Sequence, residues 1–325
     1  MVSNDYSIQF MAPVQELMPR VEERMHRQAI GHHPDLAAAL QHLLSSGGKR
    51  IRPTVALLTG MMLGAELDDL VTLAASIELL HTATLVHDDL IDGSLLRRGI
   101  ATLNSRWTPA ATVLTGDFIF AQAARLAAET NSVAVNSIFA QTLATIVNGE
   151  IAQMFGRSTL ADRHEYQQRI YAKTASMFEL ATEAAALLSP ADSATRRAAR
   201  TFGYEIGMAF QIVDDILDFT GSEGVVGKPV AGDLRQGLIT LPTICYAELY
   251  PDDPDTEFMK LGGRPSGQVI ERLIESIRSS EAIDAALEEA RGYVRRGLEA
   301  LESAPDGAEK QALIALAKYI VDRDQ

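Results

Sequence analysis

The chain has 325 residues, 47% of them hydrophobic, and a single cysteine, so a large core is possible and an intrachain disulfide or a cysteine-based metal site is excluded. Its formal net charge of −14 argues against nonspecific nucleic-acid binding. The first residues lack a basic segment followed by an apolar one, and no run reaches the roughly 18–20 uninterrupted apolar residues of a membrane span, so we expect a cytoplasmic protein.

Apolar residues recur at spacings of three and four along most of the chain, whereas alternating β-branched runs are scarce. Glycine or proline stands at most breaks in this pattern, and no repeat or linker divides the chain. The simplest interpretation is one all-α domain over residues 1–325. The pattern predicts helices over 9–29, 34–45, 51–63, 68–91, 108–129, 132–155, 163–188, 192–219, 240–249, 266–302 and 308–321.

The first cluster of cations lies in "SSGGKRIRP", where Lys49, Arg50 and Arg52 follow two glycines. Pro53 comes next and is suited to the first turn of a helix. Flexible backbone, cations and a helix N-terminus together form a good phosphate site.

The helix predicted over 68–91 carries a polar stripe near its C-terminal end. Residues Glu78, His81, Asp88 and Asp92 are spaced by three, seven and four positions and therefore share one face. Carboxylates one turn apart repel each other, and a helix C-terminus adds partial negative charge. A bound divalent cation reverses this penalty, and Mg²⁺ commonly takes one or two carboxylates plus substrate phosphates. For His81 we favour a phosphate contact over an ordinary buried hydrogen bond.

A second segment, "AFQIVDDILDF", repeats the arrangement with Gln211, Asp214, Asp215 and Asp218 on one helix face. A single cluster of this kind is equally well explained as a solvated face or a helix cap. Two copies, each at the end of an apolar helix, favour metal sites that face one another across a cleft and hold a polyanion.

Further cations accompany these clusters. Each of them alone is commonly a surface charge, but together they predict contacts to one or two diphosphates. They are Arg97 and Arg98, Lys173 with Thr174 in "YAKTAS", and Lys228 in the glycine-rich loop 221–237. These residues imply the metal-assisted departure of diphosphate from a substrate with an apolar tail.

Four blocks, "GGKRIRP", "LLHTATLVHDDLIDGSLLRRG", "GMAFQIVDDILDF" and "GKPVAGDLRQGLITLP", resemble the signatures of trans-isoprenyl diphosphate (polyprenyl) synthases, in the family's order over 47–242. The resemblance implies the all-α isoprenoid synthase fold, a large helical bundle around a central cavity, usually in a homodimer. It also implies a prenyltransferase that joins isopentenyl diphosphate to an allylic diphosphate. Many members have a lysine where this chain has Leu238, so one diphosphate contact is absent or is supplied by another residue.

The resemblance assigns roles residue by residue. Mg²⁺ ions, about three per site, would be held by Asp88 and Asp92 and by Asp214 with Asp218 nearby. The allylic diphosphate would be contacted by Arg97, Lys173, Thr174, Gln211 and Lys228, and isopentenyl diphosphate by Lys49, Arg52, His81 and Arg98. The residues predicted to serve catalysis itself are Asp88, Asp92, Arg97, Lys173, Asp214 and Lys228.

Product length is predicted from the residues below the first acidic cluster. Ala83 and Thr84 are small where short-chain members typically carry a bulky aromatic residue, so we expect a medium- to long-chain product of roughly 30 to 50 carbons, such as a quinone side-chain precursor. The tunnel floor would lie deeper, on the helix over 132–155, although ordinary core packing explains its apolar residues equally well. A product of this kind suggests brief contact with a membrane surface during release.

Four other functions remain open at this point. A short-chain farnesyl or geranylgeranyl synthase and a noncatalytic subunit of a heteromeric synthase have the same fold, but such subunits tend to lose aspartates or arginines that are intact here. A terpene cyclase normally carries an asparagine/serine/glutamate motif where this chain has "DDILD". A helical scaffold would leave the repeated clusters unexplained.

Overall fold

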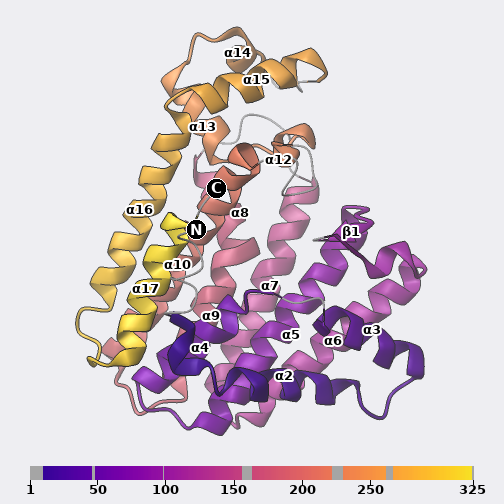
Figure 1. The fold of residues 1–325 in the computed structure, drawn as a ribbon, viewed down its shortest axis with the longest axis vertical. Coiled ribbons are helices and arrows are strands. Elements are labelled where there is room, and N and C mark those ends of the chain that lie inside the picture. Colours follow the sequence, from indigo (N-terminus) through magenta and orange to yellow (C-terminus); the bar gives the residue numbers. More distant parts are fainter. Residues whose placement is uncertain are drawn as a thin grey trace. The chain divides into compact units, whose positions relative to one another are not determined.

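The computed structural model describes residues 10–45, 48–97, 99–155, 163–221, 230–260 and 266–323. Almost every element in these ranges is a helix, which confirms the all-α prediction (Figure 1). Two predicted site residues, Arg98 and Lys228, lie outside the described residues.

Contacts divide the chain into two compact units. The first comprises Met1–Leu143, Met177–Gly203 and Ala300–Leu316, and the second comprises Ala144–Ser176, Tyr204–Glu299 and Ala317–Gln325. Helices α7 (Val133–Phe155) and α10 (Ser193–Thr220) contribute residues to both. Our expectation of a single domain over 1–325 stays a prediction.

The first unit is built around one long buried helix and a short hairpin. Its elements are η1 (Ala12–Val14), α2 (Met18–His26), η2 (Arg27–Ala29), α3 (Pro34–Ser45), α4 (Ile51–Met62), the long helix α5 (Leu67–Ile91), the hairpin strands β1 (Leu96–Arg97) and β2 (Ile100–Ala101), η3 (Leu103–Ser105), α6 (Pro109–Glu129), most of α9 (Ser176–Leu187) and the first parts of α7, α10 and α17 (Ala308–Asp322).

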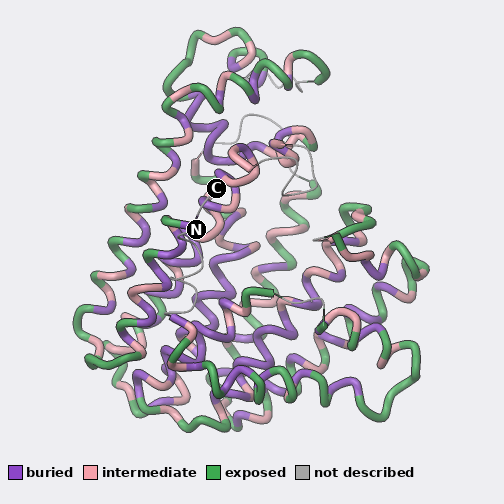
Figure 2. The backbone as a smooth tube through the Cα atoms, in the orientation of Figure 1, coloured by how far each residue is buried: buried purple, intermediate pink, exposed green. Residues whose placement is uncertain are grey.

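Helix α5 forms the core of this unit because it is apolar on almost every side. It packs against α2, α4 and α6, and Figure 2 shows it buried along most of its length. It is also the one helix among the described residues that is long and apolar enough to cross a membrane, yet 78% of its most apolar window is buried inside the protein. That burial is typical of a core helix in a soluble protein.

The second unit contains the remaining helices. They are α8 (Arg163–Ile170), the π turn η4 (Tyr171–Ala175), α12 (Gly232–Arg235), α13 (Leu241–Leu249), α14 (Pro254–Lys260), α15 (Gln268–Ser279) and α16 (Ala282–Ala300), with the later parts of α7, α10 and α17. Arg163 fixes the start of α8, because its guanidinium donates to both carboxylate oxygens of Glu248 on α13 at 2.8 Å and also to Glu289 on α16.

Two predicted helices are wrong as continuous elements. The segment over 9–29 is divided into η1, α2 and η2, with Pro13 and Pro19 in the first turns of η1 and α2, where a missing N–H costs nothing. The segment over 266–302 breaks at Ser280, which is extended and whose hydroxyl accepts the N–H of Ala282 at 3.2 Å.

Candidate active site

Helix α5 stops directly after the predicted acidic pair because of a glycine. Gly93 adopts φ +64°, its N–H donates to Leu90 O at 3.2 Å, and the N–H of Ser94 donates to Asp89 O at 2.9 Å. This pair of bonds is the Schellman ending of a helix, in which glycine best tolerates the left-handed conformation. Asp92 therefore lies at the C-cap, in the partial negative charge of the helix terminus.

Asp88 and Asp92 share one face of α5, as the spacing predicts. The N–H of Asp92 donates to Asp88 O at 2.8 Å, so the two residues are one helical turn apart. Asp88 is half-buried and Asp92 is exposed, so both carboxylates are within reach of solvent and ligands.

The aspartate between them has a different role. Asp89 is buried, its Oδ1 accepts a hydrogen bond from Nε of Arg97 at 2.9 Å, and Nη2 of Arg97 lies 2.9 Å from the same oxygen in an ion pair. Arg97 belongs to β1, which pairs antiparallel with β2. The ion pair holds the hairpin on the end of α5, and the guanidinium stays partly exposed beside the predicted metal-binding pair.

The second acidic cluster, at the C-terminal end of α10, is already paired with a cation. Arg323 lies just after α17, and its Nη2 forms an ion pair with Asp214 Oδ1 at 2.7 Å and donates to Phe210 O at 2.8 Å. The guanidinium also lies 4.2 Å from the centroid of the Phe210 ring. Our sequence reasoning missed Arg323, because nothing local in the sequence places the chain terminus at this helix.

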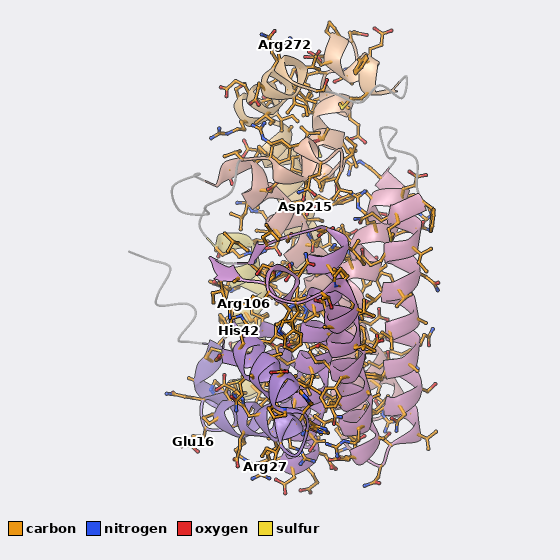
Figure 3. All side chains as sticks on the ribbon, turned by 90° about the vertical axis from the view of Figure 1, so that its right-hand side faces the viewer. Glu16, Arg27, His42, Arg106, Asp215 and Arg272 are labelled. Atoms are coloured by element: carbon orange, nitrogen blue, oxygen red, sulfur yellow. The ribbon has the colours of Figure 1, made fainter. Side chains whose placement is uncertain are left out.

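Asp215 is the buried centre of a hydrogen-bonded network in the second unit (labelled in Figure 3). Its carboxylate accepts from Tyr166 Oη and from Gln211 Nε2, each at 2.8 Å. Gln211 Oε1 in turn accepts from Thr174 Oγ1 at 2.6 Å. The structure therefore brings together two predicted diphosphate contacts, Gln211 and Thr174, and Asp215 holds Gln211 in place through a hydrogen bond.

Burial sets the protonation of this network. The pKa of Asp215 is raised to about 7, chiefly by burial and also by the charges of Asp233 and Asp214, while the hydrogen bonds from Gln211 and Tyr166 oppose the rise. Burial and the Asp215 charge also raise the pKa of Tyr166 well above its ordinary value, so the phenol remains a donor.

A pH-dependent stability follows from the raised Asp215 pKa. Between its ordinary value of 3.8 and about 7, the folded state holds a proton that the unfolded chain has lost, so the free energy of unfolding falls as pH rises through this window. We expect Asp215→Asn to remove that part of the slope. Urea unfolding of metal-free protein at several pH values measures this, and equal slopes in wild type and variant would contradict it.

Asp218, the fourth predicted metal ligand, caps α12. Its Oδ1 and Oδ2 accept the N–H groups of Gly232 and Asp233, both at 3.1 Å. The carboxylate thus holds the later part of the glycine-rich segment 221–237, and its assignment as a metal ligand stays a prediction.

Lys173 and Thr174 lie in the π turn η4, an irregularity common at functional sites. Thr174 is buried toward Gln211, whereas Lys173 is half-exposed and its Nζ lies 3.4 Å from Glu150 Oε1. The turn therefore points neighbouring polar residues in different directions.

The predicted isopentenyl diphosphate contacts belong to the first unit. Lys49 is exposed just before α4, and Arg52 in its first turn is half-buried with its guanidinium 5.1 Å from the centroid of the Phe178 ring. His81 is half-buried on α5. The two predicted chain-length residues are buried on the same helix: Ala83 is 0% exposed, and Thr84 donates from Oγ1 to His81 O at 2.8 Å.

The residues present fit a divalent ion that takes part of its shell from other molecules. Within the described ranges, no three histidine, cysteine or acidic side chains converge on one point. A pair of accessible carboxylates such as Asp88 and Asp92 suits Mg²⁺, which usually keeps several waters and substrate phosphate oxygens. At the second cluster, the Asp214 carboxylate already carries one cation, the Arg323 guanidinium.

Known proteins resemble the chain over almost its entire length. A family model described as polyprenyl synthetase matches residues 33–276. Heptaprenyl diphosphate synthase component 2 of Bacillus subtilis is 35% identical over 93% of this chain and 87% of its own, and octaprenyl diphosphate synthase of Haemophilus influenzae is 34% identical over 94% of each. A crystal structure of polyprenyl synthase from Caulobacter crescentus, complexed with calcium and isoprenyl diphosphate, is 34% identical, with a TM-score of 0.91 over 98% of both chains.

The chain belongs to the polyprenyl synthetase family, with the all-α isoprenoid synthase fold. It is a prenyltransferase, and its relatives identify it as a trans-polyprenyl diphosphate synthase of the medium- to long-chain type. This confirms the family, the fold class and the activity expected from the sequence.

Proposed function

We propose that the protein extends an allylic diphosphate with isopentenyl diphosphate in a reaction that depends on divalent metal, with Mg²⁺ as the natural ion. The observation that carries the proposal is the accessible Asp88–Asp92 pair at the C-terminus of a buried apolar helix. Two carboxylates in a helix-terminal negative potential are unfavourable by themselves and become favourable around a cation and a diphosphate.

The residues then divide the work of one condensation. Bound Mg²⁺ ions, about three per site, supply positive charge to the leaving diphosphate. Asp88, Asp92 and Asp214, with Asp218 nearby, hold these ions, while Arg97, Lys173, Lys228 and the Thr174–Gln211 pair contact the diphosphate and stabilise the charge that develops as its C–O bond breaks.

The second substrate forms the new bond. Lys49, Arg52, His81 and Arg98 hold isopentenyl diphosphate so that its double bond attacks the allylic cation. A new carbon–carbon bond forms, a proton passes to the released diphosphate, and a trans double bond remains. The apolar wall contributed by α5 keeps water from capturing the cation.

The product is proposed to have roughly 30 to 50 carbons, because Ala83 and Thr84 leave no bulky side chain below Asp88. Two relatives are named as a heptaprenyl diphosphate synthase component and an octaprenyl diphosphate synthase, which supports this range. A homodimer is the proposed assembly. The alternative, a second and different subunit, has support from the relative described as a component of heptaprenyl diphosphate synthase.

We place the protein in the cytoplasm, with brief contact between its lipid-like product and a membrane surface. The test of the proposed function is incubation of the purified protein with isopentenyl diphosphate, a farnesyl or geranyl primer and Mg²⁺, with products measured by mass spectrometry. We expect a ladder of products ending in the proposed range, and none after chelation of the metal. A cyclic terpene, or no product until another protein is added, would contradict the proposal.

A further inference from the structure

Arg50 lies between two predicted diphosphate contacts, yet its side chain turns into the protein. Only 11% of the side chain is exposed. Nη1 donates to Glu78 Oε1 at 2.7 Å, Nη2 donates to Leu44 O at 2.9 Å, and Nε lies 3.6 Å from Glu22 Oε1. Arg50 is the N-cap residue of α4, so its guanidinium joins the start of this helix to α2, α3 and α5.

The backbone of Arg50 is held in a conformation that residues with side chains seldom adopt. Its φ and ψ are +47° and +36°, in the left-handed region. The carbonyl of Arg50 accepts from Thr54 twice, from N at 3.1 Å and from Oγ1 at 2.8 Å. With both its side chain and its carbonyl bound, the residue is fixed well enough to keep this geometry.

The partner of Arg50 is an acid in an apolar helix. The Glu78 side chain is 8% exposed, and it lies on α5 one turn before His81. A buried ion pair is expensive to desolvate and is no better for stability than a well-packed apolar pair. Its position is therefore informative: it ties the segment bearing Lys49 and Arg52 to the helix bearing His81.

We propose that the Arg50–Glu78 ion pair is the positioning element of the isopentenyl diphosphate subsite. It holds the left-handed turn at Arg50, which separates the exposed Lys49 from the half-buried Arg52 and keeps both at a fixed register to His81. The proposal rests on the proposed function, since it assigns these three cations to that substrate.

The first test is Glu78→Gln, measured by steady-state kinetics and by calorimetric binding of isopentenyl diphosphate without primer. We expect KM and Kd for isopentenyl diphosphate to rise about tenfold or more, because small displacements of binding groups have large effects. The KM for the allylic primer and kcat at saturation should change less than about twofold. The reason is that the variant weakens the binding of isopentenyl diphosphate alone, and saturation with that substrate restores the rate. Arg50→Lys should fall between wild type and Glu78→Gln, because lysine lacks the planar fork.

A pair of variants at Arg50 separates backbone conformation from charge. Arg50→Gly and Arg50→Ala both remove the ion pair, but glycine adopts φ > 0 readily. We expect Arg50→Gly to bind isopentenyl diphosphate several-fold more tightly than Arg50→Ala. Equal Kd values for the two variants would overturn the role of the left-handed turn.

The control is Glu129→Gln, which removes an acid paired with Arg24 on α2 and with Arg125 on α6. Glu129 is paired with none of the three residues assigned to isopentenyl diphosphate in this proposal. The variant should leave both KM values unchanged. Equal loss for both substrates in Glu78→Gln, or an unchanged KM for isopentenyl diphosphate in an active enzyme, would overturn the inference alone. Wild-type protein that makes no prenyl product at all would instead overturn the proposed function.

Discussion

Asp88→Ala should lower kcat/KM by about 10²- to 10³-fold or more, the scale of removing one preorganised electrostatic contact to a leaving group. The carboxylate is half-buried at the C-terminal end of α5 and is one of a pair for a metal ion. Its loss should also raise the Mg²⁺ concentration needed for half-maximal activity. Initial rates at a series of Mg²⁺ concentrations measure both effects.

The same substitution should leave the fold intact. In the metal-free protein, Asp88 repels Asp92 and lies in the negative potential of the helix terminus, each effect costing a few tenths to about 1 kcal/mol. We therefore expect the free energy of unfolding of Asp88→Ala, measured with chelator present, to equal or exceed that of wild type.

The opposite end of the same helix offers a matched control. Asp68 is exposed in the first turn of α5 and pairs with Arg20. There the helix terminus is positive and favours an anion. Asp68→Ala should keep full turnover and lose roughly 0.3–1 kcal/mol of stability, the reverse of Asp88→Ala. An Asp88→Ala protein that is active, or one that is unfolded, would contradict this account of the cluster.

Ala83→Phe should shorten the product. Ala83 is fully buried on α5, five positions before Asp88, where the proposed tunnel begins. A phenyl ring there would close the path of a growing chain, and overpacking should lower stability by about 1–3 kcal/mol. Mass spectrometry of the product ladder at equal turnover measures the change, and Ala83→Leu should give an intermediate length.

A buried alanine elsewhere controls for overpacking itself. Ala286 on α16 is also fully buried and belongs to no predicted substrate contact. Ala286→Phe should cost similar stability while product length stays that of wild type. If Ala83→Phe folds and makes the wild-type product, the tunnel does not pass this residue.

The features that sequence reasoning predicted well are local. The spacing of Asp88 and Asp92 and the glycine that ends α5 both act within a few residues, so the helix, its acidic face and its end could be inferred together. Two errors were also local and avoidable. Pro13 and Pro19 mark new helical starts, and Ser280 is a typical cap between α15 and α16.

What was missed depends on partners distant in the sequence. "HDDLID" gives no sign that Asp89 turns inward to Arg97, and "IVDD" gives none that Asp214 meets Arg323 or that Asp215 meets Tyr166. For Glu78, the sequence did contain a signal of an ion pair, because an acid on an apolar helix is expected to be buried and a buried acid needs a partner. Its partner Arg50 was visible only as one more cation.

The proposed chemistry depends on carboxylates that bind diphosphate through metal ions. Crystals grown with Mg²⁺ and an unreactive thio-analogue of the allylic diphosphate test this most directly. We predict metal density bonded to the carboxylates of Asp88 and Asp92, and to that of Asp214, with the analogue's phosphate oxygens completing the metal coordination. An analogue bound without metal, with these carboxylates facing bulk solvent, would contradict it.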